Sequence, residues 1–457
     1  MDKATQILTE IADTVCGYPL FIALIGGGLW LLLSSGLVSL RRLPDALRAL
    51  RRKPGANEPG GISSAQALMS VVAATVGMGN IAGVAIAIAM GGAGAVFWMW
   101  VSAAVGMCTK YHEGVLAVKF RKTDADGTHR GGTMHIIERG LGAAWRPLAV
   151  CFAVAGMFGT LCIMNANQLT EALASAAGRI IADDMTLRLC IGIAIAATVG
   201  LVVLGGVKRI ANVATVMVPF MVTAYFAMVF YIIVTHIDGV PGVISSIFHD
   251  AFSLEAGWGA LAGVAIIGAR RAALVNDAGV GTASIMHGTS ANREPVTEGL
   301  VAMLGPAIDS GFVCTLTAFA ILLGAEITPG ETQGLTLAMS AFGSAIPAGE
   351  YMLTAIVTCF ALSSMFTYSF YGSSCAAYLF GERGRRFYTY AFIASLVVFA
   401  VVPLSAAVAM CDLFYALMAF PTMFTLLRLR ETVSRATEQY FSNNTTEYAD
   451  TRRTPCT

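Results

Sequence analysis

The feature that most constrains the fold is a membrane-length apolar segment that glycine interrupts near its middle. Residues 64–90 are mostly apolar, and Gly77-Met78-Gly79-Asn80 lies at their centre. Glycine and asparagine are unfavourable in a helix interior, and a peptide group left unpaired in hydrocarbon costs several kcal/mol. A break here is tolerable where the freed peptide groups line a polar cavity, as in the discontinuous helices of secondary transporters. The segment therefore predicts a broken transmembrane helix of a carrier.

The composition is typical of a membrane protein. Of the 457 residues, 56% are hydrophobic and 12% are charged, whereas about 25% of the residues of a typical soluble domain are charged. The net charge of +1 gives no reason to expect a nucleic-acid partner. The ten cysteines form no Cys-x-x-Cys motif, and the six histidines have no metal-ligand spacing. We therefore expect a lipid bilayer around the chain, and neither a disulfide framework nor a His/Cys metal centre.

The hydrophobic segments predict an all-α polytopic membrane protein with eleven transmembrane helices. A helix needs about 20 mainly apolar residues to cross the hydrocarbon. The first such segment follows an acidic N-terminus and is long enough to span, so we expect a retained helix and not a cleaved signal peptide. The predicted spans are 17–40, 64–90, 94–118, 147–175, 187–205, 211–235, 256–290 (interrupted), 299–324, 350–380, 386–404 and 407–427.

The placement of lysine and arginine predicts the orientation, because cytoplasmic connections are enriched in both. Basic residues are concentrated in the connections 41–53, 119–130 and 383–386, whereas the connections 236–257 and 325–350 have none. The sequence therefore predicts a bacterial-type inner (plasma) membrane protein with its N-terminus outside and its C-terminus in the cytoplasm. It does not determine the oligomeric state.

The spacing of the spans allows an inverted repeat. The ten spans after the first one form two sets of five. Because five is an odd number, the second set is inverted in the membrane relative to the first. Each set also opens with a glycine-interrupted span, and such segments at matching positions are the best sequence pointer to a transport site. The predicted parts are an N-terminal helix with a basic linker (1–62), two five-helix repeats (63–238 and 239–430) and a polar cytoplasmic tail (431–457). This is the five-plus-five plan of the leucine-transporter (LeuT-type) fold with one extra N-terminal helix.

Other classes of protein fit the same segments less well. Residues 77–82 match the Gly-x-Gly-x-x-Ala fingerprint of dinucleotide sites, but the next segment is another apolar span with no acidic residue about 20 positions further on. A membrane enzyme would need convergent histidine, cysteine or carboxylate groups, and a channel would need pore-lining repetition. The sequence shows neither pattern, so we expect a carrier and not an enzyme.

The break itself has a definite chemistry. The half-helix after it begins near Gly79 and Asn80, so its free N–H groups and positive dipole end suit a carboxylate. The glycines let the backbone approach a ligand closely. The carbonyls released before the break, at Ala73 and Val76, face the other way and can coordinate a small cation. A glycine kink that serves only helix packing is the alternative.

Several blocks of the sequence resemble one transporter family. They are Ala73–Ala85, Gly91–Trp100, Gly106–Glu113, Gly131–Met134, Arg271–Gly281, Gly299–Asp309 and Tyr371–Gly381, and the likeness extends from residue 17 to about 430. The family is that of the alanine/glycine:cation symporters (sodium:alanine symporters), which belongs to the amino acid–polyamine–cation superfamily. The resemblance implies uptake of small neutral amino acids with Na⁺, or sometimes H⁺, on a LeuT-type core preceded by one helix.

The resemblance also implies a substrate site and a sodium site at the break. The implied substrate residues are Thr75, Gly77, Met78, Gly79, Asn80, Asn165, Gly268, Leu274 and Tyr368. The implied sodium ligands are the carbonyls of Ala73, Val76 and Phe360 and the hydroxyls of Ser363 and Ser364. Serines in helices also bond to the carbonyl one turn earlier, which is the alternative role for this pair.

The sequence departs from the family pattern where the substrate would lie. Residues 272–277 read Ala-Ala-Leu-Val-Asn-Asp where the family has Gly-Leu-Phe-Ser-Asn-Glu. Asn165 stands in place of a usual glutamine and Tyr368 in place of a tryptophan. Changes of this size can shift specificity by about tenfold or more. We expect a carrier for alanine, glycine or serine coupled to Na⁺; the alternative is an H⁺-coupled carrier for another small amino acid or zwitterion.

Further polar residues lie inside the predicted spans. A charged group within the membrane is functional by default, so Asp309 is expected either to handle protons or to make a hydrogen bond between helices. Lys110 and Glu113 are expected to form an ion pair or to reach the cytoplasmic surface. One face of the segment that holds Asn167 and Gln168 is expected to meet the substrate amine, and the rest to link helices.

Two arginines lie within the interrupted seventh span. Arg270 and Arg271 are on its inner half, close in sequence to Asp277. We expect them to pair with Asp277 or Glu113 as an inner gate.

Overall fold

The computed structural model describes residues 14–51, 61–125, 127–176, 185–252, 258–324, 334–402 and 404–451. These parts are almost entirely helical, and the strands that they form are β1 (Lys122–Thr123) and β2 (His129–Arg130), an antiparallel hairpin. The helices of the first half are α2 (Tyr18–Phe21), η1 (Ile22–Gly26), α3 (Gly27–Ser34), α4 (Val38–Arg41), α5 (Leu43–Arg51), α6 (Ser64–Thr75), η2 (Gly79–Gly83), α7 (Val84–Gly91), α8 (Gly94–Lys119), α9 (Thr133–Ile136), η3 (Ile137–Leu141), η4 (Ala143–Trp145), α10 (Arg146–Gly159), α11 (Ile163–Ala176), α12 (Met185–Val203) and α13 (Gly206–Thr235). Those of the second half are η5 (Ile237–Gly239), α14 (Val240–Phe252), α15 (Trp258–Asn276), α16 (Thr282–His287), α17 (Pro295–Ala302), α18 (Leu304–Pro306), η6 (Ala307–Val313), α19 (Cys314–Gly324), α20 (Leu335–Ala345), α21 (Gly349–Phe399), α22 (Leu404–Arg428) and α23 (Arg430–Thr451).

Seven helical stretches of the described residues are long and apolar enough to cross a membrane, or eight if α6 and the helix after it form one bent span. The helices α8 and α15 are not among them. A polytopic helical membrane protein is therefore confirmed, whereas the exact number of eleven spans stays a prediction. The span predicted at 350–380 and most of that predicted at 386–404 fall within α21, which ends at Phe399 and is kinked at Gly381, where φ is 70°.

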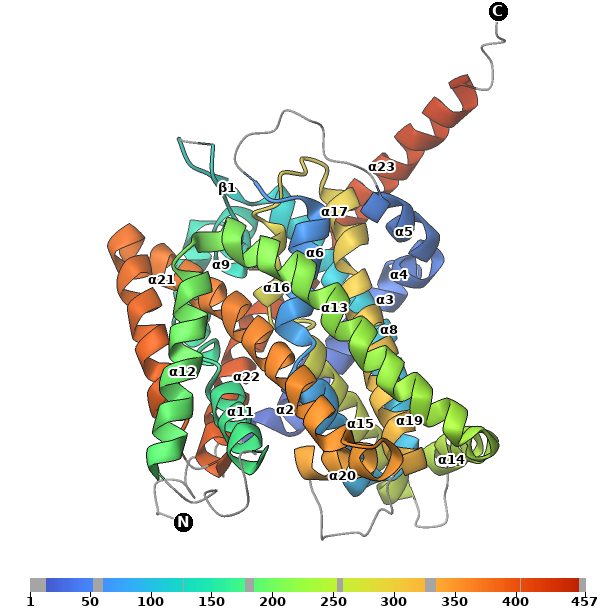
Figure 1. The fold of residues 1–457 in the computed structure, drawn as a ribbon. Coiled ribbons are helices and arrows are strands. Elements are labelled where there is room, and N and C mark those ends of the chain that lie inside the picture. Colours follow the sequence, from blue (N-terminus) through green and yellow to red (C-terminus); the bar gives the residue numbers. More distant parts are fainter. Residues whose placement is uncertain are drawn as a thin grey trace, which may run out of the picture.

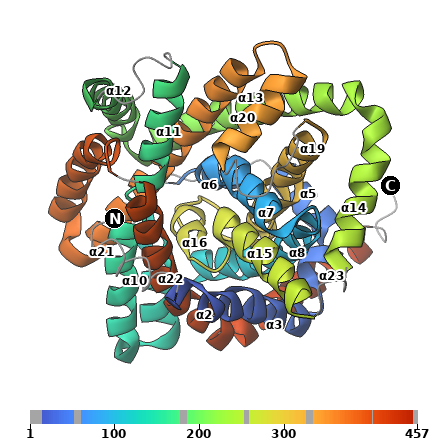
Figure 2. The same ribbon diagram turned by 90° about the horizontal axis from the view of Figure 1, so that it is seen from below.

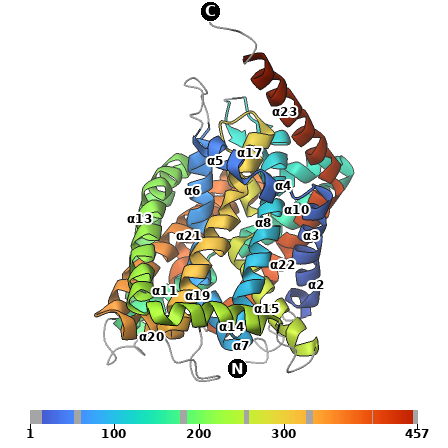
Figure 3. The ribbon, with the colours of Figure 1, turned by 90° about the vertical axis from the view of Figure 1, so that its right-hand side faces the viewer.

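The long helices run between two ends of the molecule (Figure 1). The helices α11, α14 and α20 reach the lower end in that view, while the hairpin and α23 lie at the upper end. Seen from below, the broken helices α6–α7 and α15–α16 occupy the middle, and α12, α13, α14, α21 and α22 surround them (Figure 2). In the side view α14 lies across the lower end (Figure 3). The sequence prediction places the lower end outside the cell.

The first broken helix has a well-defined beginning and end. The Ser63 hydroxyl and the Gln66 side chain form a capping box at its start, which satisfies two otherwise free N–H groups. After Thr75 the backbone of Val76 is extended (φ −71°, ψ 94°), and a π-helical turn resumes at Gly79. The two halves are bent by 56°. The break predicted at the glycines is therefore present.

The second break separates α15 from α16. Asp277, Gly279 and Gly281 have left-handed backbones with φ of 53°, 85° and 93°, a conformation that costs a residue with a Cβ of order 1–3 kcal/mol. The N–H of Gly279 donates to Glu113 Oε1 on α8 over 2.7 Å. A buried side chain of another helix therefore satisfies a peptide group that the break leaves free.

Candidate functional site

A cavity of about 700 Å³ begins at the break in α6 and is bounded by α11, α20, α21 and α22. At its lower end it is lined by Glu171 and Arg188, which form a 2.6 Å ion pair, and the side chain of Glu171 is 57% exposed. The cavity therefore extends from the break to the end of the molecule that the sequence predicts to be outside.

The cavity brings together most of the predicted substrate residues. Those that line it are Thr75, Gly77, Met78, Gly79, Asn165 and Tyr368. Asn80 is fully buried and points elsewhere, and Gly268 packs against the backbone of Ala95 on α8, where an added Cβ would collide. The side chain of Leu274 lies outside the described residues.

Two glycines allow the neighbouring helices to meet the break closely. A Cβ at Gly77 would lie 2.8 Å from Ser364 Oγ on α21, and one at Gly79 would lie 3.1 Å from a methyl group of Val275 on α15. The first approach is closer than real Cβ contacts allow, so only glycine fits at position 77 without a shift. Both helices therefore reach the break itself.

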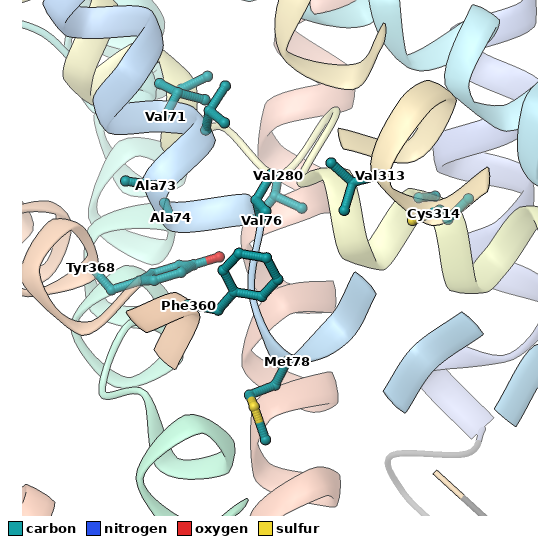
Figure 4. Close-up of a cluster of buried hydrophobic side chains, with 14 of the residues drawn as sticks. Val71, Ala73, Ala74, Val76, Met78, Val280, Val313, Cys314, Phe360 and Tyr368 are labelled. Atoms are coloured by element: carbon teal, nitrogen blue, oxygen red, sulfur yellow. The ribbon is translucent and has the colours of Figure 1, made fainter. Parts of the chain in front are cut away.

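Four of the five predicted sodium ligands, the carbonyls of Ala73 and Phe360 and the hydroxyls of Ser363 and Ser364, lie together in one group of oxygens. Ser363 Oγ lies 2.9 Å from the carbonyl oxygens of both Ala73 and Phe360. Ser364 Oγ lies 2.9 Å from the carbonyl oxygen of Ala74 and 3.1 Å from that of Phe360. Figure 4 shows Phe360 and Tyr368 on one side of the α6 segment that carries Ala73 and Ala74. The serines thus bond both within α21 and across to α6, so these uncharged oxygens fit a small hard cation.

Asn80 ties the break to the eighth predicted span. Its side-chain oxygen accepts the N–H of Gly77 over 2.9 Å, and its amide nitrogen donates to Asp309 Oδ1 on η6. Asp309 is fully buried, and its Oδ2 has no hydrogen-bond partner among the described residues. Of the two roles predicted for Asp309, the structure contains the interhelical hydrogen bond.

A chain of hydrogen bonds connects the second break to the cavity. The hydroxyl of Tyr368 donates to Asp277 Oδ2 over 2.5 Å, and the hydroxyl of Tyr415 on α22 lies 2.5 Å from that of Tyr368. Tyr415 lines the cavity with its neighbours Cys411 and Asp412. Sequence analysis did not find these three residues. Cys411 and Tyr415 lie one turn apart on a mostly apolar helix, with Asp412 beside Cys411, and this spacing is the signal that could have found them.

Of the two alternatives predicted for Lys110 and Glu113, a position at the cytoplasmic surface is wrong, and no ion pair joins the two among the described residues. Both side chains are 0% exposed, so neither reaches the cytoplasmic surface. The ammonium of Lys110 has no hydrogen-bond partner among the described residues, whereas Glu113 accepts a peptide N–H of the second break. The side chains of Arg270 and Arg271 lie outside the described residues.

The polar residues of α11 serve different purposes. Asn165, Asn167 and Gln168 all line the cavity. Asn167 also donates to the carbonyl oxygen of Val402, which follows the end of α21, over 2.5 Å. Asn167 thus both borders the cavity and links α11 to the segment after α21.

The upper end of the molecule is held together by ion pairs around Arg130. Its guanidinium contacts Asp124 of the hairpin and lies 2.7 Å from Glu382 on α21. Burial alone would raise the pKa of Asp124, but the hydrogen bond and the charge of Arg130 outweigh it and hold the pKa below its ordinary value. These contacts join the loop after α8 to α21 at the end opposite the mouth of the cavity.

Comparison with known proteins gives the family. Residues 1–454 match the model of the sodium:alanine symporter family. The chain is 37% identical over 448 residues to an uncharacterized transporter of Haemophilus influenzae, covering 95% of this chain and 96% of that protein. It is 36% identical over 447 residues to the sodium/alanine symporter AgcS of Methanococcus maripaludis, with 95% and 97% covered.

The fold is similar to that of a solved LeuT-type transporter, MhsT in complex with L-phenylalanine. The TM-score is 0.50 at 13% sequence identity, with 82% of this chain and 89% of that chain covered. The members of the matched family are transporters and not enzymes. This chain belongs to the sodium:alanine symporter family.

Proposed function

We propose that the protein imports a small neutral amino acid, namely alanine, glycine or serine, by symport with Na⁺. The observation that carries the proposal is a cavity that ends at a broken helix beside a compact group of uncharged oxygens. The name of AgcS, a sodium/alanine symporter, supports the same ion and substrate class. The proposed orientation has the N-terminus outside, the C-terminus in the cytoplasm, and two inverted repeats at 63–238 and 239–430.

The substrate carboxylate is assigned to the start of the helix after the break. The N–H of Gly79, the first residue of the helical turn after the break, and the positive end of the helix that runs to Gly91 suit an anionic group. The remainder of a small amino acid then lies toward Asn165 and Tyr368, which line the same cavity.

The sodium ion is assigned to the carbonyls of Ala73, Val76 and Phe360 and the hydroxyls of Ser363 and Ser364. The supporting contacts are those by which the two serines already bridge α21 and the last turn of α6. A cation held there would fix the carbonyl side of the break while the substrate occupies the amide side. Ion and substrate would then stabilise the same backbone conformation, so each would raise the affinity for the other.

Uptake into liposomes tests this function. Purified protein should accumulate labelled alanine under an inward Na⁺ gradient and not when choline replaces Na⁺. Preloaded unlabelled alanine should accelerate entry of the label, which distinguishes a carrier from a channel. Equal uptake in choline would contradict Na⁺ coupling.

Coupling to H⁺ is the second candidate, and one observation favours it. Asp309 is a fully buried carboxyl group with one unpartnered oxygen among the described residues, and Asn80 connects it to the break. Accumulation driven by a pH gradient without Na⁺ would support this alternative and contradict the first.

A further inference from the structure

The chain of hydrogen bonds from Asp277 to Tyr415 runs from the buried second break into the substrate cavity. Asp277 is 1% exposed and Tyr368 is 7% exposed, whereas Tyr415 is half-buried. Both tyrosines line the cavity, and Asp277 does not. This series of hydrogen bonds thus begins at a buried carboxylate and ends at a phenol group that faces the cavity.

Each hydroxyl in this chain has a fixed direction. A carboxylate can only accept hydrogen bonds, so the Tyr368 hydroxyl must donate its proton to Asp277. The oxygen of Tyr368 can then only accept, so the proton of Tyr415 is directed to it. Consecutive bonds of this kind polarise and strengthen one another in a low dielectric. The oxygen of Tyr415 is left with lone pairs and no proton to offer a ligand.

Other contacts hold the Asp277 carboxylate, at which the series of hydrogen bonds begins, in place. Asp277 Oδ2 also lies 3.3 Å from the hydroxyl of Thr282 at the start of α16. Its left-handed backbone, with φ of 53°, fixes where the carboxylate begins. The ring of Tyr371 lies 5.5 Å from that of Tyr368 in an edge-on arrangement, which restricts the Tyr368 ring. The direction of the Tyr415 hydroxyl is therefore set by the protein before any substrate enters.

We propose that Tyr415 is a specificity-determining residue: its oxygen accepts a hydrogen bond from the substrate side chain and so selects a small amino acid that carries a hydroxyl group, such as serine. Tyr368 and Asp277 are positioning residues that act through it. The inference rests on the proposed function, in which the carboxylate lies at Gly79 and the rest of the substrate lies toward Asn165 and Tyr368, whose hydroxyl group Tyr415 contacts. A site that offers a lone acceptor favours a ligand with a donor over one of the same shape without it.

The test compares two ligands of equal size. L-serine and L-2-aminobutyrate differ by a hydroxyl in place of a methyl group, so the size of the pocket affects both alike. With purified full-length protein in saturating Na⁺, the Kd of each is measured by competition against labelled alanine. We expect the wild-type protein to bind serine about tenfold more tightly than 2-aminobutyrate. The measured quantity is the Kd of 2-aminobutyrate divided by the Kd of serine. Tyr415→Phe should bring this ratio close to one, and Tyr368→Phe should also lower it.

Tyr371→Phe is the matched control. Its hydroxyl has no hydrogen-bond partner among the described residues, although its ring lies beside Tyr368. This variant removes the same atom from the same region and should keep the wild-type ratio. If Tyr415→Phe does not fold, the comparison of the two ligands in the wild-type protein still tests the proposal. A Kd of 2-aminobutyrate equal to or below that of serine in the wild-type protein overturns it.

The possible failures are distinguishable. If alanine binding does not depend on Na⁺ in the wild-type protein, the proposed function fails. If alanine binds with Na⁺ and Tyr415→Phe keeps the wild-type ratio, only the role of Tyr415 is wrong. An equal weakening of both ligands in Tyr415→Phe also overturns it, because it would mean that Tyr415 contacts the ammonium group and not the side chain.

Discussion

At the scale of single residues, the break in α6 depends on two positions that lack a side chain. The missing side chain at Gly77 lets Ser364 approach, and the missing side chain at Gly79 lets Val275 approach. The same two glycines interrupt the helix, so peptide groups there lose their partners within it, which is costly at membrane depth unless water, a ligand or a side chain bonds to them. The Asn80 oxygen already occupies the N–H of Gly77. The amide of Gly79 is therefore the one that we assign to the substrate.

Gly79→Leu should abolish amino acid binding. The added Cβ would lie 3.1 Å from Val275, and the rest of the side chain would extend into the place assigned to the carboxylate. Binding of labelled alanine in Na⁺ should be lost while the protein remains inserted and monodisperse. Gly242→Leu on α14 is the control, because a Cβ there meets nothing within 4 Å. Normal alanine accumulation by Gly79→Leu would mean that the break serves helix packing alone.

The double change Ser363→Ala with Ser364→Ala should raise the Na⁺ concentration that gives half-maximal alanine binding by about tenfold or more, because each lost hydrogen-bonding group is worth of order 1 kcal/mol. Ser369→Ala on the same helix is the control, since its hydroxyl bonds to the carbonyl of Phe366 in its own helix. Titration of Na⁺ at fixed labelled alanine measures the effect. An unchanged Na⁺ dependence would exclude these hydroxyls as ligands.

At the scale of elements, the two broken helices are supported from outside. Glu113 of α8 accepts the N–H of Gly279, 166 positions away in the sequence, and Asn80 connects the first break to η6. A broken helix cannot supply these bonds itself, because the residues that would pair with the free peptide groups have left the helical path. The breaks are therefore held by whole neighbouring helices.

Glu113→Ala should lower the thermal stability, because it leaves the N–H of Gly279 buried without a partner, at a cost of about 1–3 kcal/mol. Glu113→Gln keeps an oxygen that can accept this bond and should remain close to the wild-type protein. The apparent Tm of the purified proteins in one detergent compares the three. Equal loss in both variants would show that the charge of Glu113, and not the bond to Gly279, provides the stabilisation.

The sequence could predict the first break because its cause is local: two glycines, separated by one residue, within one apolar segment. The grouping of Ser363 and Ser364 with Ala73 followed from a resemblance, since nothing local relates residues 290 positions apart. The family resemblance did not point to Tyr415. Its bond to Tyr368 spans 47 positions and that of Tyr368 to Asp277 spans 91. The burial of Lys110 and Glu113 was missed for the same reason, because it results from the packing of α8 against helices distant in the sequence, chiefly α15 and α17.

At the scale of the whole molecule, the two ends differ. The cavity reaches the lower end, which is predicted to be outside, while Arg130 joins the hairpin to α21 at the upper end. Ion pairs that are partly exposed contribute little singly, but these connect elements that must separate if the cavity is to open upward. A second pocket of about 650 Å³ lies at the upper end, and Asp124, Arg130 and Glu382 line it. If the proposed carrier works by alternating access, the ion pairs around Arg130 would favour the state whose substrate cavity opens at the lower end.

Arg130→Ala should shift the population toward the state that is open at the upper end, because it removes the contacts to both Asp124 and Glu382. Cys411 lines the cavity and is partly accessible, so a membrane-impermeant thiol reagent applied from outside should label it, and Cys411→Ser should remove that signal. The rate of this labelling should fall in Arg130→Ala by about the factor by which the outward-open population falls. Arg48→Ala is the matched control, since its ion pair with Asp45 lies within one turn of α5 and joins no second element. Faster labelling in Arg130→Ala, or an equal change in Arg48→Ala, would mean that the ion pairs at the upper end do not set the balance between the two states.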